Sequence, residues 1–564
     1  MEIESIKTKR GEEIPIGKLT VLVGANNVGK SQTLRDIHKR LTAGPAARTV
    51  LIGEVRTRKP STFDDLFEGL RVVPDPSNVG YHLVRGVASN LLGGDELRLD
   101  LTAFRSQYEQ AEGLDFMLGN LSRFRVTYLD AESRLSVSKA TDAFNPHVEA
   151  PRHLLHAVFA DRSKESALRE VFVSTFGEHV RLGYSGMTRL AFRVARQFED
   201  VPADPREAYP IMSQYSLLDE QGDGYRSFVA VVLTILLSEK RVVLLDEPEA
   251  FLHPAQAREL GMWLGRHAAA VPGQVLISTH NASFLSGIVT ASADVEVFRL
   301  NRRGDTTHFQ RMSREATTNL ARSPILSSQR VLEAIFFVGV IVCEADSDRV
   351  VYQSVADNME ESSDVLFLHA HNKQTLHQVV QLLRAAGVPT VAIADIDLMI
   401  EESEFTRLLS ALSPTADLAE ANLLRHDIAI AAGEESEDKV LQHLMIVVEE
   451  FLEQLRGNEH TLAGARGALN RLRRTAGGWA ALKRDGLGAL ATAAAEKASH
   501  LLELCKAIGL FLVPVGELES WMALGTTRKN EWVVKALHEI HAGRASAGLR
   551  DFVSEALRNV RGRT

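Results

Sequence analysis

Residues 24–31 read GANNVGKS and fit the pattern G-x-x-x-x-G-K-[ST]. A short β-rich run, LTVLV at 19–23, precedes them, and a helical segment, SQTLRDIHKRL, continues from Ser31. This is the strand–loop–helix context that the pattern requires, because backbone N–H groups of the loop and the helix N-terminus together surround phosphate oxygens. We therefore expect a nucleotide-binding loop. Its candidate ATP-binding residues are Gly24, Asn26, Asn27, Gly29, Lys30 and Ser31.

Two of these side chains have specific expected roles. Lys30 is expected to reach the β- and γ-phosphates, and Ser31 is expected to ligate Mg²⁺. The second half of the site is predicted at residues 242–248, VVLLDEP, where four apolar residues place Asp246 at the end of a buried strand facing the Mg²⁺ shell. Glu247 is then positioned as the catalytic residue that polarises the attacking water.

Two histidines follow the acidic pair. The segment continues as EAFLHP, and the next predicted strand ends in ISTH. His280 directly follows that buried strand, which favours a role as γ-phosphate sensor. His253 either has a related function or only caps and packs.

The order DEPEAFLHP and then a histidine after the next strand resembles the ABC/SMC-like ATPases. The resemblance implies an α/β ATPase that binds ATP between two copies. One element departs from the family: the signature, often LSGGQ-like, is replaced by LDEQGDGYRS at 218–227, whose acidic residues suit a phosphate poorly. Arg134, in LDAESRL, is either another arginine that reaches phosphate or part of a surface salt bridge.

A second α/β unit is predicted from about residue 338. The apolar runs VIVC (340–343), VLFLHA (365–370) and TVAIAD (390–395) alternate with helical segments, a βαβαβ rhythm that predicts a parallel sheet. Carboxylates follow these strands: Glu344, Asp348, Asp395 and Asp397. We expect Asp395 and Asp397, two apart on a strand, to share a face. The strand ends converge in one crevice, and oxygen-only ligands suit Mg²⁺ or Mn²⁺.

This order of acids resembles the TOPRIM fold, and EADSD at 344–348 resembles the E-G-x-x-D form of OLD (overcoming lysogenization defect) nucleases, with alanine at 345 in place of glycine. The resemblance implies a further acid near the end of the domain, for which we prefer Glu519 to Glu517. It also implies that Lys373 stabilises a scissile phosphate. The implied metal ligands at this second site are Glu344, Asp348, Asp395, Asp397 and Glu519, with Glu344 and Lys373 as catalytic residues.

What the OLD resemblance implies is an ATP-regulated, metal-dependent DNA endonuclease, a homodimer or larger assembly, often acting in defence against phage. Two-metal hydrolysis would suit the carboxylates. Two other classes stay open. One is a non-nucleolytic ATPase sensor or scaffold whose TOPRIM domain controls a partner effector protein. The other is a DNA-structure ATPase of the SMC or repair kind, although no heptad-rich arm is long enough for a coiled coil.

The predicted domain order is an ABC-like ATPase over 1–145 and 186–325, interrupted at 146–185 by a helical candidate for dimerisation, and a TOPRIM domain over 335–564. A helical insertion is expected at 403–504, where Arg471, Arg473 and Arg474 either touch DNA backbone or form a solvated helix face. The 564 residues carry a net charge of −9 and only two cysteines. With no signal peptide or membrane-spanning run, we expect a cytoplasmic protein without a membrane partner.

Overall fold

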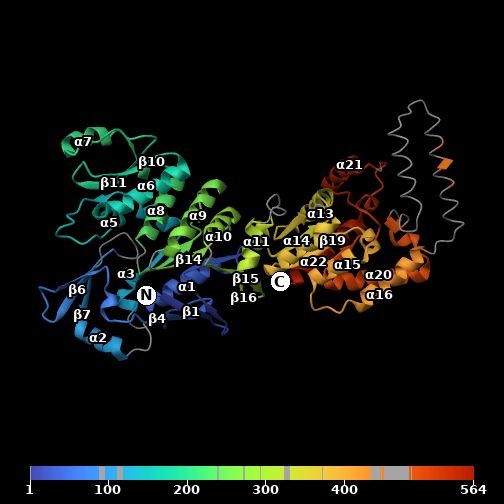
Figure 1. Cartoon of the computed structure of the whole chain (residues 1–564), viewed down its shortest axis with the longest axis horizontal. Helices are drawn as coiled ribbons and strands as arrows, with labels where there is room; N and C mark the ends of the chain where they lie inside the picture. The colour runs from blue at the N-terminus through green and yellow to red at the C-terminus, as the bar shows by residue number, and fades with distance from the viewer. Residues whose placement is uncertain are drawn as a thin grey trace. The chain divides into compact units, whose positions relative to one another are not determined.

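The computed structural model divides into two compact units, Met1–Arg322 and Ser323–Thr564, each described by itself (Figure 1). The structure describes residues 2–563, with gaps at 88–95, 111–117, 238–239, 271–272, 293, 323–330, 362, 371, 434–444, 446–447, 450–451, 453–481, 484 and 527.

A six-stranded sheet forms the centre of the N-terminal unit, in the order β16-β15-β3-β14-β13-β8. Its strands are β3 (Leu19–Gly24), β8 (Val126–Leu129), β13 (Val242–Asp246), β14 (Gln274–Ser278), β15 (Val295–Arg303) and β16 (Thr306–Arg311). All neighbours are parallel except β15 and β16. Every residue of β3, β13 and β14 is buried, as expected for strands of a parallel sheet covered on both faces.

Helices pack against this sheet, and two of them approach each other very closely. The helices are α1 (Lys30–Ala43), α8 (Asp223–Leu236), α9 (Pro254–Ala270), α10 (Ala282–Ala291) and α11 (Arg314–Arg322). Between α9 and α10, a Cβ added at Gly261 would lie 2.2 Å from the carbonyl oxygen of Phe284, and one at Gly287 would lie 2.3 Å from that of Arg258. Only glycine permits this approach, which brings the segment after β14 tightly against the helix after β13.

Smaller antiparallel sheets flank the central one. The first joins β1 (Glu2–Thr8), β2 (Glu13–Pro15) and β4 (Ile52–Arg58). The second joins β5 (Arg71–Pro74), β6 (Tyr81–Arg85) and β7 (Leu97–Asp100), beside α2 (Leu101–Gln110) and α3 (Leu118–Arg125). The third joins β9 (Thr141–Asp142), β10 (His179–Gly183), β11 (Arg189–Ala195) and β12 (Ser216–Leu217), with α4 (Ala131–Val137) before it and α7 (Pro205–Met212) within it.

The segment 146–185 contains the two helices expected from its sequence, α5 (Leu154–Ala160) and α6 (Arg162–Phe176), but it is not wholly helical. Its last residues form β10, which pairs with β11 beyond the predicted boundary. The alternation of buried and exposed residues in β10 and β11 matches one face against a core. The predicted helical segment 146–185 is therefore part of a longer α/β segment, which extends to β12.

The C-terminal unit is built on a parallel sheet in the order β18-β17-β19-β20. Its strands are β17 (Gly339–Cys343), β18 (Val365–His369), β19 (Thr390–Ala394) and β20 (Leu510–Leu512). Its helices include α13 (Asp346–Asn358), α14 (Lys373–Ala385), α21 (Lys529–His541) and α22 (Ala547–Gly562). The predicted βαβαβ rhythm and the return to a strand near residue 510 are both present.

The chain between β19 and β20 is mainly helical where the structure describes it. It contains α15 (Glu402–Leu412), α16 (Ala419–Gly433) and α20 (Thr492–Ile508). The α16 and α20 helices pack against each other, and Lys497 pairs with Asp427 across them. The basic run at Arg471, Arg473 and Arg474 lies outside the described residues.

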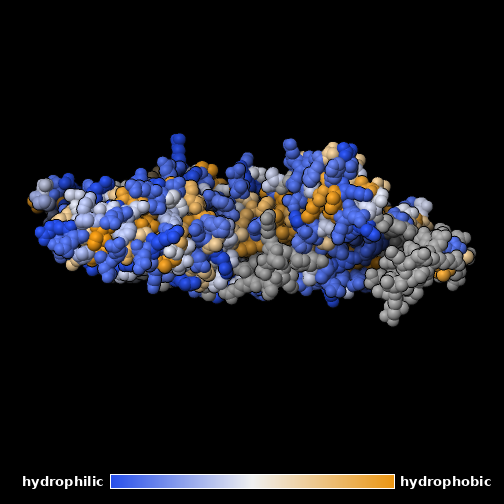
Figure 2. Space-filling view, turned by 90° about the horizontal axis from the view of Figure 1, so that it is seen from above, coloured by the Kyte–Doolittle hydropathy of each residue, from blue (hydrophilic) through white to orange (hydrophobic). Residues whose placement is uncertain are grey.

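On the face drawn in Figure 2, hydrophobic residues occur in scattered groups among hydrophilic ones. Within the described residues, no helix combines the length and the apolar character needed to cross a membrane.

Candidate functional site

The phosphate-binding loop connects β3 to α1 and depends on residues with positive φ. Gly24 has φ 140°, Asn27 62° and Gly29 104°. A Cβ at Gly24 would lie 2.4 Å from the carbonyl oxygen of Leu300, so the loop can follow this path only with glycine there. Gly29 directly precedes α1, and this brings the N-terminus of that helix to the loop.

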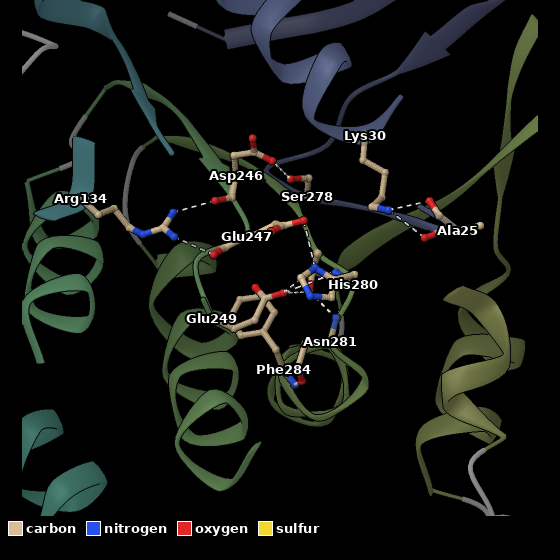
Figure 3. A network of polar contacts seen from close by, with 12 residues as sticks. Ala25, Lys30, Arg134, Asp246, Glu247, Glu249, Ser278, His280, Asn281 and Phe284 are labelled. Atoms are coloured by element: carbon tan, nitrogen blue, oxygen red, sulfur yellow. Dashed lines mark hydrogen bonds and ion pairs between the residues drawn. The ribbon is translucent and has the colours of Figure 1, made fainter. Parts of the chain in front are cut away.

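Lys30 is 6% exposed, and its Nζ donates hydrogen bonds to the carbonyl oxygens of Gly24 and Ala25, both at 2.8 Å (Figure 3). Burial lowers the pKa of Lys30, whereas the nearby Glu247 and Asp246 oppose this shift. The ammonium group is thus held inside the loop, on the side from which phosphate oxygens would be bound.

A cleft of about 750 Å³ opens over the loop. Its lining includes the predicted residues Asn26, Asn27, Gly29, Lys30, Ser31 and Glu247. The β15–β16 hairpin contributes Arg302 and Thr307, whose side chains donate to the carbonyl oxygens of Asn27 (3.3 Å) and Val28 (2.8 Å). The volume lies within the range of ligand pockets and suits a nucleotide.

Asp246 ends β13, as predicted, and two neighbouring strands hold its carboxylate. Ser278 at the end of β14 donates to Oδ1, and the Tyr128 hydroxyl in β8 donates to Oδ2 at 3.2 Å. These bonds fix the orientation of a carboxylate that is only 7% exposed. The parallel register of β8, β13 and β14 brings the three side chains to one edge of the sheet.

Glu247 and His280 form an ion pair at this edge, with 3.0 Å between Nδ1 and Oε1 (Figure 3). The hydrogen bond between them raises the pKa of His280 and lowers that of Glu247, which favours a protonated imidazole beside a carboxylate. Glu247 has φ 51°, a conformation that non-glycine residues rarely adopt. The structure thus brings together both residues that were predicted to act near the γ-phosphate.

Glu249 is a buried acid of this site that the sequence analysis did not single out. It is 3% exposed and accepts a hydrogen bond from the Thr279 hydroxyl at 2.6 Å. Its Oε1 also lies 4.0 Å from His280 Nδ1. Burial raises the pKa of Glu249. His253, in contrast, is exposed, and its ring and backbone contact Ala255 and Gln256 at the start of α9, as the capping alternative proposed.

Both readings of Arg134 were wrong. Its side chain is fully buried and reaches neither the surface nor the phosphate loop. Instead, it donates to the carbonyl oxygens of Asp246 (2.6 Å) and Glu247 (2.9 Å) and to the Ser227 hydroxyl (2.9 Å). Arg134 therefore holds the backbone of the catalytic turn, including the unusual conformation of Glu247.

The segment that replaces the family signature begins α8. Leu218–Glu220 is one turn of 3-10 helix, Gly222 caps α8, and Gly224 lies against the carbonyl of Phe251, with 2.9 Å to an added Cβ. Asp223 pairs with Arg226 at 3.1 Å, and Asp219 accepts from the backbone N–H of Ala140. These acidic side chains have partners within the chain.

The second candidate site lies at the C-terminal ends of β17 and β19. Carboxylate oxygens of Glu344, Asp395 and Asp397 all lie within 4.8 Å of one another. Burial, followed by the effect of neighbouring carboxylates, raises the pKa of Asp395 well above its usual range and raises that of Glu344 to about 7. Glu344 Oε2 is buried without a hydrogen-bond partner in the described part of the chain. Such a group of oxygen ligands fits a divalent cation.

Three lysines surround these carboxylates. Lys373 forms an ion pair with Asp397 Oδ1, and Lys483 lies 3.0 Å from Oδ2 of the same residue. Although burial opposes it, these two contacts lower the pKa of Asp397. Lys529 lies 3.1 Å from Asp348. Lys483 and Lys529 were not predicted, because single lysines far along the chain form no motif.

The remaining predicted acids lie around this group. Asp348 is 5% exposed and accepts from the Ala345 backbone N–H at 3.2 Å, which closes the first turn of α13. Glu517 lies 3.8 Å from Lys483, and its pKa is raised by burial and by Glu519. The structure gives no preference for Glu519 over Glu517: Glu517 lies near Lys483, and, although burial opposes it, Asp348 and Glu519 raise the pKa of Lys529.

The expectation that Asp395 and Asp397 share a face of one strand was wrong in its geometry. Strand β19 ends at Ala394, and Asp397 lies in a turn of 3-10 helix, Ile396–Ile400. The turn still directs both carboxylates to Glu344, so the pair converges through a tight turn rather than through strand alternation.

Two family models match separate parts of the chain. A family described as "AAA domain, putative AbiEii toxin, Type IV TA system" matches residues 91–286, which contain Asp246, Glu247 and His280. A family described as "Overcoming lysogenization defect protein-like, TOPRIM domain" matches residues 335–397, which contain Glu344, Asp348, Lys373, Asp395 and Asp397. No curated protein sequence matches the chain.

Solved structures similar to the chain include SMC heads. The SMC head domain from Thermotoga maritima is 15% identical, with 56% of this chain and 100% of that chain covered and a TM-score of 0.27. An Smc head domain from Pyrococcus furiosus, with an extended coiled coil and bound to the C-terminal domain of ScpA, is 12% identical, with 57% and 98% covered and a TM-score of 0.32.

The fold and the family matches define an AAA-type ATPase domain joined to a TOPRIM domain. The TOPRIM match is to an OLD-like family, which confirms the resemblance to OLD proteins in that part of the chain, and the match in the N-terminal unit is to an AAA domain family.

Proposed function

We propose that this chain is an ATP-binding and ATP-hydrolysing, divalent-metal-dependent DNA endonuclease of the OLD type, acting in defence against phage. The observation that carries the nuclease proposal is the group of Glu344, Asp395 and Asp397 oxygens within 4.8 Å, at the C-terminal edge of the parallel sheet. Three mutually close carboxylates, two of them with raised pKa values, are poorly satisfied unless a cation joins them.

In this proposal, Glu344, Asp395 and Asp397 hold one or two Mg²⁺ or Mn²⁺ ions, with Asp348 and either Glu519 or Glu517 completing the ligands. Bound cations would supply an activated water and neutralise charge on the phosphate. Lys373 and Lys483 flank Asp397 and are placed to bind a scissile phosphate once a cation takes over that carboxylate.

At the ATP site, Lys30 binds the β- and γ-phosphates, and Ser31 and Asp246 position Mg²⁺. Glu247 accepts a proton from the attacking water, while the protonated His280 stays beside the γ-phosphate. We further propose a homodimer that holds ATP between two copies, supported by the exposed positions of Gly222 and Asp223 at the start of α8 and by the ABC-like order of motifs. ATP binding would control whether DNA reaches the metal site, and it would either permit or inhibit cleavage.

The ion pairs of the metal site support a second candidate. Because Lys373, Lys483 and Lys529 already compensate Asp397 and Asp348, the carboxylates could persist without a cation. The chain would then be a non-nucleolytic ATPase sensor or scaffold whose TOPRIM domain controls a partner effector protein.

A nuclease assay separates the two. Purified protein is incubated with plasmid and linear DNA in Mg²⁺ or Mn²⁺, with and without ATP, beside Glu344→Gln and Glu247→Gln. We expect metal-dependent cutting that Glu344→Gln reduces more than about 100-fold, whereas ATP hydrolysis is unchanged. Glu247→Gln should retain ATP binding and lose hydrolysis by about 100-fold or more. Equal cutting by Glu344→Gln would refute the metal site, and no cutting at all would favour the scaffold.

A further inference from the structure

A second basic cavity lies in the N-terminal unit, at the end of the central sheet opposite the phosphate loop. Its volume is about 560 Å³. Two of its lining residues, Arg125 and Arg241, directly precede the parallel strands β8 and β13, whereas the phosphate loop directly follows the C-terminal end of β3. Because β3, β8 and β13 run in the same direction, the cavity and the ATP site are at opposite edges of one sheet.

The sheet register places two buried arginines side by side. Val126 pairs with Val242, so Arg125 and Arg241 occupy neighbouring positions, and they are 6% and 9% exposed. In the described part of the chain, both guanidinium groups donate hydrogen bonds to backbone carbonyl oxygens. Arg125 donates to those of Leu66 (2.8 Å) and Glu68 (2.7 Å), and Arg241 donates to that of Val87 (2.8 Å).

This environment is unfavourable for cations in the absence of an anion. Burial lowers the pKa of Arg125 to about 10, and burial together with the charge of Arg125 lowers the pKa of Arg241 to about 10. Adjacent buried charges of one sign persist where a compensating charge is bound.

The rest of the wall is also basic. Four more cations line the cavity, against two acids: the cations are Arg71, Arg85, Lys164 and Lys240, and the acids are Glu68 and Glu149. Glu68 is paired with Lys240, and Arg71 donates to the carbonyl oxygen of Val148 at 3.2 Å. These cations come from β5, β6, α6 and the turn before β13. Arg85 pairs with Glu96 at 2.6 Å, and Lys164 lies 3.8 Å from Asp161.

We propose that this cavity binds a compact phosphate-bearing ligand, either a free polyphosphate or phosphate ester or the phosphates of a short single strand. Guanidinium groups bind phosphate through paired N–H donors, and the volume suits a ligand of nucleotide size rather than a duplex. No residue that lines this cavity belongs to the ATP site or to the group of Glu344, Asp395 and Asp397. The protein could therefore bind, and respond to, a second anionic ligand in addition to ATP.

The test uses the full chain and inorganic tripolyphosphate as the probe, with binding measured by titration calorimetry. Lys30→Ala removes the contribution of the ATP site. In this variant we expect tripolyphosphate to bind. The double variant Arg71→Ala/Arg85→Ala should weaken it at least about tenfold, because two charged donors are lost, while ATP binding is retained. Arg169→Ala, an exposed arginine of α6 outside the cavity, is the matched control.

A competition arm identifies the source of the phosphate. Displacement of tripolyphosphate by a single-stranded tetranucleotide assigns the cavity to nucleic acid, and its failure assigns the cavity to a free polyphosphate or phosphate ester. Absence of tripolyphosphate binding once the ATP site is blocked would overturn the proposal. So would equal binding by Arg71→Ala/Arg85→Ala and Arg169→Ala. Neither result would affect the nuclease assay.

Discussion

Glu247 shows how a single residue can be held in a costly conformation. Its φ of 51° is fixed from both sides: its N–H donates to the carbonyl of Ser278 at 2.9 Å, and its own carbonyl accepts from Arg134. The DEP motif predicted the chemistry of Glu247, but no motif could predict Arg134, because a buried arginine that bonds backbone atoms has no characteristic sequence spacing. The same applies to Lys483 and Lys529, whose roles depend on contacts with residues far away in sequence.

Metal binding at the carboxylate group is expected to depend on pH. The pKa of Glu344 in the metal-free protein is about 7, against a usual 4.5, so this carboxylate must lose a proton to bind a cation at lower pH. We expect the dissociation constant for Mn²⁺, measured by calorimetry, to fall at least about tenfold for each unit by which the pH rises toward about 7, and to level off once Asp395, whose pKa is also raised, has lost its proton.

A matched variant tests the cause of that profile. Lys373 lowers the pKa of Glu344, so Lys373→Met should move the levelling point to higher pH. A dissociation constant for Mn²⁺ that stays the same between about pH 5 and about pH 8 would contradict the raised pKa of Glu344.

At the scale of elements, strands were predicted better than the turns that follow them. VIVC, VLFLHA and TVAIAD form β17, β18 and β19, because continuous apolar runs of this length suit a parallel sheet. The turn after β19 was not predicted, since turns depend on local backbone geometry, and the pairing of β10 with β11 was not predicted, since it depends on a partner strand. The phosphate loop was predictable because its glycines and its lysine are required at fixed spacing.

The histidine that caps helix α5 should make the N-terminal unit less stable at acidic pH. His153 caps this helix, and its Nδ1 accepts from the Leu155 backbone N–H at 3.2 Å, which requires an unprotonated nitrogen. Burial, with a smaller effect of His156, lowers the pKa of His153 to about 4.

The unfolded state therefore binds a proton more readily than the folded state, and the free energy of unfolding should fall as the pH drops from about 6.5 to about 4. The full effect is about 3 kcal/mol. Urea unfolding of the wild type and of His153→Asn across this range measures it. Asparagine caps helices without titrating, so the variant should lose this part of the pH dependence. Parallel pH profiles for the two proteins would contradict the assignment.

At the scale of the whole molecule, each unit has its own sheet and its own candidate ligand. In the C-terminal unit, Trp532, Phe511 and Leu549 belong to one buried cluster that includes residues of β17 and β19. We expect calorimetry to resolve two unfolding transitions. MgATP should raise only one of them, and Mn²⁺ added without nucleotide should raise the other, because a ligand stabilises the unit that binds it.

Two variants assign these transitions. Lys30→Ala should abolish the shift caused by MgATP, and Asp395→Ala should abolish the shift caused by Mn²⁺. A single transition that both ligands raise equally would show that the units unfold as one.

The order of strands in the C-terminal sheet has a consequence for synthesis. Strand β20 pairs with β19, although it begins at Leu510, more than a hundred residues after β19 ends. A chain emerging from the ribosome can join β17, β18 and β19, and hence Glu344, Asp395 and Asp397, long before β20 is made. Lys483 is made after these strands but before β20, and Glu517 and Lys529 follow β20. A nascent chain therefore carries Glu344, Asp395 and Asp397 before it carries all the lysines of the site, and the proposed nuclease would become competent only once Lys529 has been made.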